Sequence, residues 1–156
     1  MNLASIMTHH VVCVGMDDTV RRVQELFDQY KFHHLIVVDP APRAGSDEPP
    51  SGQVVGMVTD RDLLHALSPY LHTGAERPLD RACLDRHVHQ IMTRHVTTAP
   101  ETMPVEEATL LVLQQGLTAL PVLNAQGHCV GIVTWHDLLR WCLHGGCDPN
   151  RRAKAA

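Results

Sequence analysis

A seven-residue motif occurs twice in this chain and constrains its fold more than any other feature of the sequence. The two copies are Gly56-Met57-Val58-Thr59-Asp60-Arg61-Asp62 and Gly131-Ile132-Val133-Thr134-Trp135-His136-Asp137. An earlier segment, Ile6-Met7-Thr8, returns 85 residues later as Ile91-Met92-Thr93, and the spacing falls to 75 at the seven-residue motif. Self-similarity in a fixed order indicates two copies of one structural unit. The change in spacing places a loop insertion in the first copy, between Asp39 and Gly56.

Within each copy, the residue pattern predicts the order strand, helix, strand, strand, helix. The first copy is expected to have strands at Val11–Val14, His34–Val38 and Val54–Val58, and helices at Val20–Tyr30 and Asp60–Leu67. Apolar residues recur at spacings of three and four in the helices, whereas the last two strands are continuously apolar, as in strands covered on both faces. In the second helix, Leu63, Leu64 and Leu67 are expected to point inward. The fold class that follows is α/β.

The repeated motif places a hydroxyl and a carboxylate where a strand turns into a helix. Thr59 and Thr134 end the apolar strands, and Asp62 and Asp137 follow three residues later, in the first helical turn. Backbone N–H groups at a helix N-terminus suit a phosphate, while an ionised carboxylate accepts hydrogen bonds from vicinal sugar hydroxyls. Ordinary helix capping explains each residue taken singly. Because the whole phrase is repeated, we favour a nucleotide site.

Composition excludes several other classes of protein. The formal net charge of -4 and pI near 6.3 argue against a binder of nucleic acid or of anionic membranes. We find no signal peptide and no apolar run long enough to span a bilayer, so a cytoplasmic protein is expected. No nucleophile elbow or Walker-type loop is present, and we predict that the chain is not an enzyme. The runs Leu110–Leu113 and Leu138-Leu139 are expected to be core or dimer surface.

Twelve histidines raise the alternative of a metal-binding protein. The densest groups are His9-His10, His87-x-His89, and Cys142-x-His144 with Cys147. None has the spacing of a recognised structural zinc site, so exposed histidines are favoured and no metal ligand is predicted.

Taken together, these motifs resemble the cystathionine-beta-synthase (CBS) domain in tandem, an arrangement called a Bateman module. The resemblance extends from Leu3 to about Leu143. It implies an α/β (α+β) fold of two repeats, each a small mixed sheet packed with helices, related by a pseudo-twofold axis with two clefts between them. The expected divisions are repeat 1 at 1–68 with a mobile loop at 40–53, a linker at 69–90, repeat 2 at 91–143, and a flexible tail at 144–156.

The resemblance also implies which residues line the two sites. Asp62 and Asp137 would each hold a ribose, and Thr59 and Thr134 would each meet a phosphate. Arg61 and His136 occupy the adjoining phosphate position, and only the arginine is permanently charged. His33-His34 and Thr118-Ala119 would border the nucleotide, while backbone and apolar atoms near Val12 and Thr97 would grip the adenine across the pseudo-dyad. Since Trp135 also replaces Asp60, the two sites are expected to differ, with more phosphate preferred beside Asp62.

Modules of this kind bind AMP, ADP or ATP, and sometimes S-adenosylmethionine or NAD, and they usually form dimers. The resemblance therefore predicts a regulatory nucleotide sensor that acts as a homodimer on a protein the sequence does not identify. A ligand-free dimeric scaffold is the alternative, and a metal-binding protein is less favoured.

Overall fold

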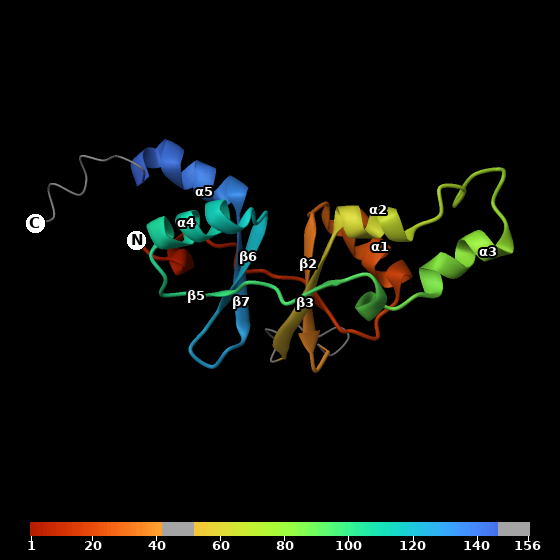
Figure 1. Cartoon of the computed structure of the whole chain (residues 1–156), viewed down its shortest axis with the longest axis horizontal. Helices are drawn as coiled ribbons and strands as arrows, with labels where there is room; N and C mark the ends of the chain where they lie inside the picture. Colours follow the sequence, from red (N-terminus) through yellow and green to blue (C-terminus); the bar gives the residue numbers. More distant parts are fainter. Residues whose placement is uncertain (42–51, 147–156) are drawn as a thin grey trace, which may run out of the picture. The chain divides into compact units, whose positions relative to one another are not determined.

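The computed structural model describes residues 1–41 and 52–146. Their strands are β1 (Cys13–Val14), β2 (His34–Asp39), β3 (Gln53–Thr59), β4 (Thr93–Arg94), β5 (Ala99–Pro100), β6 (Ala119–Leu123) and β7 (Cys129–Thr134). The α-helices are α1 (Val20–Tyr30), α2 (Asp60–Ala66), α3 (Pro78–Arg81), α4 (Val105–Gln115) and α5 (Trp135–Trp141), as seen in Figure 1. Short helical turns lie at Leu3–Ser5, Ala82–Asp85, Val88–Gln90 and Cys142–Gly146.

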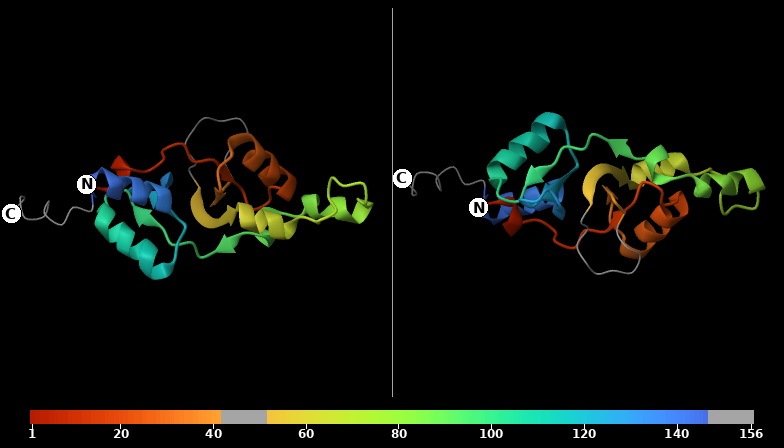
Figure 2. Two further views of the ribbon diagram at one scale, coloured as in Figure 1. Left: turned by 90° about the horizontal axis from the view of Figure 1, so that it is seen from above. Right: turned by 90° about the horizontal axis from the view of Figure 1, so that it is seen from below.

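The chain divides into two compact units, each with its own sheet and core. The continuous unit, Val11–Val96, contains a mixed sheet in the order β1-β2-β3-β4, in which β1 is parallel to β2 and the other pairs are antiparallel. The discontinuous unit joins Met1–His10 to the chain from Thr97 onward and contains the mixed sheet β5-β6-β7. Both units can be traced in the two views of Figure 2. The predicted α/β class is confirmed.

The hydrophobic cores of the two units are built in the same way. Helix α1 buries Val20, Val23 and Leu26 in the core of the continuous unit, together with Leu35 of β2. Val105 and Val112 of α4 play the same part in the discontinuous unit. Each helix ends in a left-handed residue, Lys31 at φ 56° and Gly116 at φ 63°. Glycine, which stands at position 116, is the residue type suited to that conformation.

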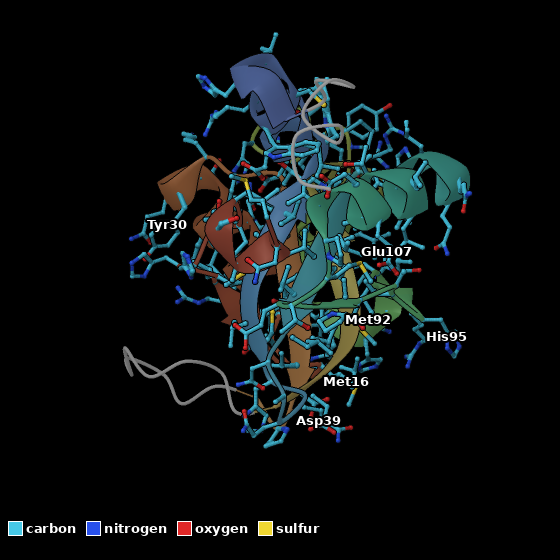
Figure 3. All side chains as sticks on the ribbon, turned by 90° about the vertical axis from the view of Figure 1, so that its left-hand side faces the viewer. Met16, Tyr30, Asp39, Met92, His95 and Glu107 are labelled. Atoms are coloured by element: carbon cyan, nitrogen blue, oxygen red, sulfur yellow. The ribbon has the colours of Figure 1, made fainter. Side chains whose placement is uncertain are left out.

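The opening segment of each repeat packs in the unit formed by the other repeat. Met7 lies against Gly131 of β7, and a Cβ atom added at that glycine would collide with the Met7 side chain. Met92, labelled in Figure 3, has the same relation to Gly56 of β3. Backbone pairing follows the same pattern, since Thr8 bridges to Ile132 and β4 pairs with β3. Both motif glycines therefore allow a methionine-bearing segment to approach a strand closely.

Most predicted element positions are confirmed, and the differences are local. The first strand is shorter than expected, beginning at Cys13 rather than Val11. The segment expected as a linker contains α3 and a 3-10 turn that directly follows it. The expectation that Leu64 points inward was wrong. Its side chain is 70% exposed, whereas Leu63 and Ala66 fill the buried positions of α2. A seven-residue helix buries one narrow face, and Leu64 falls outside it.

Two predicted mobile segments lie largely outside the described residues. They are the loop at 40–53, of which 42–51 is not described, and the tail at 144–156, of which 147–156 is not described. Within the described part of the chain, no helix combines the length and apolar character needed to cross a bilayer.

We expect Gly56→Ala to destabilise the continuous unit. The new methyl group would lie 2.7 Å from Sδ of Met92 and 2.9 Å from the backbone oxygen of Thr93, and the backbone cannot turn aside as a flexible side chain can. Overpacking of this kind costs about 1–3 kcal/mol, measurable by urea unfolding. Gly74→Ala is the control, since nothing lies within 4 Å of the added methyl group. Equal stabilities of the two variants would contradict the close packing described.

Candidate functional site

One end of the sheet in the continuous unit gathers the site residues predicted for the first repeat. His34 begins β2 and pairs with Thr59, which ends β3 and caps helix α2. Val12 immediately precedes β1, and because β1 runs parallel to β2, it lies at the same end. Because β3 is antiparallel to β2 and β1 is parallel to it, residues from three separate sequence segments lie at the same end of this sheet.

The discontinuous unit repeats this arrangement with different side chains. Ala119 begins β6 and pairs with Thr134, the N-cap of α5, while β5 runs parallel to β6. Thr97 lies two residues before β5, and its hydroxyl donates a hydrogen bond to Oε1 of Gln115 at 2.7 Å. In each unit, the site residues predicted for one repeat thus lie at one end of the sheet of that unit.

The motif carboxylates close the same capping arrangement in both units. Oδ2 of Asp62 accepts hydrogen bonds from the backbone N and the hydroxyl of Thr59, both at 2.8 Å. Oδ2 of Asp137 accepts the same pair from Thr134, at 2.8 and 2.7 Å. These two donors use both lone pairs of one carboxylate oxygen. In the described part of the chain, Oδ1 of each carboxylate makes no hydrogen bond, so an acceptor is left over at each junction.

The capping hydrogen bonds involve the threonine and Oδ2 of the aspartate, but not Oδ1. The threonine hydroxyl gives its proton to the aspartate and lies 3.2 Å from the backbone N of Asp62 in the first unit. Each threonine is therefore engaged in holding the junction. The remaining carboxylate oxygen of each aspartate takes no part in the capping box.

Those neighbouring positions are charged in the first unit. Nδ1 of His33 lies 2.8 Å from Oδ2 of Asp60, and the backbone N of Arg61 donates to Oδ1 of the same aspartate at 2.8 Å. The hydrogen bond from His33 is the main cause that lowers the pKa of Asp60, which stays ionised. The Arg61 side chain is exposed. An ionised acid, a histidine and an arginine therefore occupy the positions next to the first motif carboxylate in sequence or in strand pairing.

The second unit replaces this charged group with aromatic surface. Trp135 takes the place of Asp60, and its indole lies with its centroid 3.8 Å from that of the His136 ring, tilted by 33°. Trp135 is 45% exposed, so part of its surface is open to solvent. Thr118 stands where the first unit has His33, and no ion pair equivalent to His33–Asp60 is found among the described residues of this unit.

The two residues that begin the second strands also differ. Burial is the largest influence on His34 and lowers its pKa, while Asp60 and Asp62 act in the opposite direction and His33 adds to the lowering. The His34 ring therefore favours its neutral form. Ala119 is fully within the core at the matching place.

The histidine groups do not assemble into a metal centre within the described residues. No three His, Cys, Asp or Glu side chains there lie close enough together to hold a metal ion. His87 and His89 stack with centroids 5.6 Å apart, and their Nδ1 atoms lie 2.9 and 3.1 Å from the backbone oxygens of Asp17 and Met16. These hydrogen bonds fasten the segment before β4 to the start of α1.

Residues 3–69 and 88–144 match the CBS domain. The chain belongs to the CBS domain family. It is 31% identical over 135 residues to a CBS domain-containing protein of Dictyostelium discoideum, covering 86% of each chain. The predicted family and the two-repeat architecture of small mixed sheets with helices are therefore confirmed.

Similar CBS domains also occur within much longer proteins. The chain is 28% identical to inosine-5'-monophosphate dehydrogenase of Halobacterium salinarum over 147 residues, which cover 93% of this chain but only 25% of the enzyme. The similarity thus concerns a quarter of that protein, and it carries no inference about the dehydrogenase reaction.

Solved structures of CBS pairs have the same fold. The Arabidopsis thaliana protein CBSX2, solved in complex with AMP, is 26% identical to this chain, with a TM-score of 0.68 and coverage of 93% of this chain and 98% of that one. A CBS domain pair solved with 5'-methylthioadenosine and S-adenosyl-L-methionine has a TM-score of 0.68 at 23% identity, covering 94% and 97% of the two chains. At that lower identity, the likeness concerns the fold.

The hydrogen bond between His33 and Asp60 is the site feature that sequence reasoning missed. The two residues are 27 positions apart, but the strand that follows His33 pairs antiparallel with the strand that precedes Asp60. The predicted hairpin of β2 and β3 contained the signal, because residues flanking its open end must face each other. The Thr97–Gln115 hydrogen bond had no such signal in the sequence.

We expect the stability of the protein to fall as the pH drops from about 7 toward 5, in part through His34. The unfolded chain binds a proton near the ordinary histidine pKa of 6.5, whereas the lowered pKa of folded His34 delays its protonation. Acid therefore favours the unfolded state. His34→Ala, which introduces the residue found at position 119, should flatten this part of the curve of unfolding free energy against pH. A slope equal to that of the wild type would contradict the burial argument.

Proposed function

We propose that this chain is a regulatory CBS module that binds an adenine nucleotide beside its motif carboxylates. The observation that carries the proposal is the repeated junction in which Asp62 and Asp137 each use Oδ2 for capping and leave Oδ1 available. The AMP complex of the similar protein CBSX2 supports the ligand class.

Each carboxylate is proposed to receive ribose hydroxyls at its remaining oxygen. An ionised carboxylate is only an acceptor, which matches a pair of hydroxyl donors and does not match a phosphate. The phosphate is proposed to meet Arg61 in the first unit and His136 in the second. Val12 with His33-His34, and Thr97 with Thr118-Ala119, are proposed to border the ligand in their respective units.

Unequal surroundings predict unequal ligands at the two carboxylates. In the first unit, the fixed charge of Arg61 attracts phosphate, while Asp60 is hydrogen-bonded to His33. In the second unit, the exposed indole of Trp135 offers a flat apolar face suited to stacking on a base. We therefore propose that the first unit prefers the more phosphorylated ligand among AMP, ADP and ATP. NAD and S-adenosylmethionine remain alternatives within the same class.

Regulation requires that the ligand bind one arrangement of the protein more tightly than another. A ligand of equal affinity for both arrangements shifts no population, however strongly it binds. We propose that a homodimer passes nucleotide occupancy to a separate regulated protein through altered packing, and that the chain itself is not catalytic.

A ligand-free dimeric scaffold is the second candidate function. Its support is the capping box, since the two hydrogen bonds to each Oδ2 give the motif a structural role that needs no ligand. Under this interpretation, the motif would be retained for about 1 kcal/mol of helix capping in each unit.

Ligand-dependent thermal stability separates the two candidates. A ligand at 100 times its dissociation constant adds about 2.7 kcal/mol to the stability of the state that binds it. We expect AMP, ADP or ATP to raise the melting temperature, with GTP as the matched control for the purine ring and zinc as the test of the metal alternative. If no adenosine compound shifts the melting temperature, the scaffold is favoured. A shift with zinc alone that His87→Ala and His89→Ala abolish would favour metal binding.

The roles of the two phosphate positions are tested by Arg61→Gln and its matched variant His136→Gln. A charge-assisted hydrogen bond contributes about 1.5–3 kcal/mol, so Arg61→Gln should weaken ATP binding at least tenfold in calorimetric titrations. Adenosine, which lacks phosphate, should bind both variants as it binds the wild type. Equal effects of the two substitutions on ATP would contradict the assignment of the preferred phosphate site to the first unit.

The ribose assignment is tested by Asp62→Asn and Asp137→Asn. The amide oxygen still accepts the capping hydrogen bonds, so the loss of stability should stay small while the negatively charged acceptor is removed. We expect weaker binding of both adenosine and ATP, with the larger loss for ATP at Asp62. Unchanged binding by both variants would remove the carboxylates from the site.

A further inference from the structure

The chain that follows helix α2 makes an excursion from the body of the continuous unit. Leu67 before the excursion and Leu84 after it both pack in the core of that unit, and we call residues 68–82 the arm. Figures 1 and 2 show the arm, which includes α3, extending away from the sheet of the unit. Leu71 is partly buried against the core, whereas most of the other arm residues are exposed. The arm therefore contributes little to the core and much to the surface.

Hydrogen bonds give the arm a defined shape. Oε2 of Glu76 accepts a hydrogen bond from the backbone N of His72 at 2.6 Å, and Oε1 accepts one from Nε of Arg81. Oγ of Ser68 donates to Oδ1 of Asp80 at 2.6 Å, which joins the start of the arm to α3. Fixing the backbone of a segment costs conformational entropy, and these polar bonds offset part of that cost where little apolar surface is buried. The arm is thus ordered by its own interactions.

The carboxylates of the arm are used within the unit, while its guanidinium groups are open to solvent. Side-chain exposure is 11% for Glu76 and 71% for its partner Arg81. The hydrogen bond from Arg81 is the main cause that lowers the pKa of Glu76, so this acid stays ionised. Asp80 is half-buried and bound to the backbone N of Arg77. Within the residues that the structure describes, the exposed Arg77 takes part in no ion pair. The outer surface of the arm is therefore basic.

An apolar strip lies beside these guanidinium groups on α3. Leu79 is 82% exposed, and Pro78 and Ala82 are exposed as well. At 100° per residue, these three positions fall on one side of the helical turn, with Arg81 at the border of that side. Asp80 falls outside it. Helix α3 thus presents an apolar strip with a basic edge.

Folding alone does not explain this combination. Single exposed leucines are common on protein surfaces and need no function. Here, however, the exposed leucine lies with other apolar groups on an ordered segment, and exposed arginines accompany it. The core of the unit draws Leu84 and Val88 from the turns that follow, and both are buried. The strip and its basic edge are therefore free to contact a partner.

We infer that the arm docks an acidic amphipathic segment of another protein. Apolar side chains of that segment cover Pro78, Leu79 and Ala82, which removes exposed apolar surface from water. Its carboxylates pair with Arg77 and Arg81, because a guanidinium group binds a carboxylate through two parallel hydrogen bonds. The carboxylates of the arm itself are largely covered, so they repel such a partner only weakly.

The same surface suits a nucleic acid or a membrane less well. Both attract proteins through many cations, and a lipid-binding cluster has about four to eight lysines or arginines close together. The arm has two arginines and no lysine, and the formal net charge of the chain is -4. A phosphate backbone also offers the apolar strip nothing to pack against. A protein segment that carries both apolar groups and carboxylates is therefore the favoured partner.

Helix α2 connects the arm to the candidate nucleotide site of the same unit. The helix begins at the junction that holds Asp62 and ends two residues before Ser68. Its seven residues span about 10 Å. Identifying the docked protein with the regulated protein rests on the proposed function, whereas the docking itself requires no nucleotide.

Selection from a phage-displayed library of random dodecapeptides identifies the chemistry that the arm prefers. The full chain is the bait, and peptides that also bind a variant combining Arg77→Gln with Leu79→Gln are removed. We expect the remaining peptides to be rich in aspartate and glutamate interspersed with leucine or aromatic residues. Thermal unfolding verifies that the variant, which is altered at two exposed positions, is folded.

Fluorescence polarisation with the most enriched peptide measures the contribution of each side chain. Leu79→Gln and Arg77→Gln should each raise the dissociation constant at least about tenfold, because each removes a group that contacts the peptide. The matched controls are Leu64→Gln on α2, where the leucine is 70% exposed, and Arg22→Gln on α1. Both lie outside the arm and should change the constant by less than about twofold. Higher ionic strength should weaken binding to the wild type more than to Arg77→Gln.

Three results would overturn the docking inference. They are recovery of no peptide that depends on the arm, arm-dependent peptides that lack acidic residues, and binding of phosphatidylserine vesicles that Leu79→Gln abolishes. Equal effects of the arm and control substitutions would overturn it as well. A thermal shift with AMP, ADP or ATP in the absence of arm-dependent peptides would leave the nucleotide proposal standing. Arm-dependent acidic peptides without such a shift would support docking and count against nucleotide sensing.

Discussion

The hydrogen bonds from threonine to aspartate at the end of β3 and of β7 are the interactions on which each unit depends. They fix the point at which a strand stops and a helix begins, and so set the direction of that helix relative to its sheet. In each unit, the same hydrogen bonds hold the carboxylate at the end of the sheet where the first two strands of that sheet begin. In each unit, one carboxyl group thus caps the helix through Oδ2. Its other oxygen is the one that we propose for the ligand.

The sequence predicted the fold well because its information was local and was given twice. Thr59 and Thr134 are the N-caps of α2 and α5, as the repeated motif indicated. Errors arose where packing between elements decides the result. Leu64 satisfies the apolar pattern of α2, yet a short helix has room for few inward side chains, and the pattern could not tell which leucine would be left outside.

For the candidate site, the sequence identified the residues at the two strand-to-helix junctions but not the hydrogen bonds that they make. The repeat singled out Asp62 and Asp137, but no pattern stated that one oxygen of each is consumed by capping, because both interpretations require the same residue types. The lowered pKa of His34 also could not be read from the sequence, since it depends on burial by neighbours that are distant along the chain. Differences between the repeats were visible from the start at positions 60 and 135, but only the structure pairs the first with His33 and the second with the ring of His136.

The exchange of opening segments has a consequence for the order in which the chain folds during synthesis. The unit Val11–Val96 is continuous, so all its parts have been made once Met92 is available to pack on Gly56. The first ten residues belong to the other unit and must wait until Gly131 has left the ribosome. This segment is thus made well before the strand that it packs against. Leu3 and Met7, both buried in the finished unit, are apolar groups without their native contacts until the second repeat is complete.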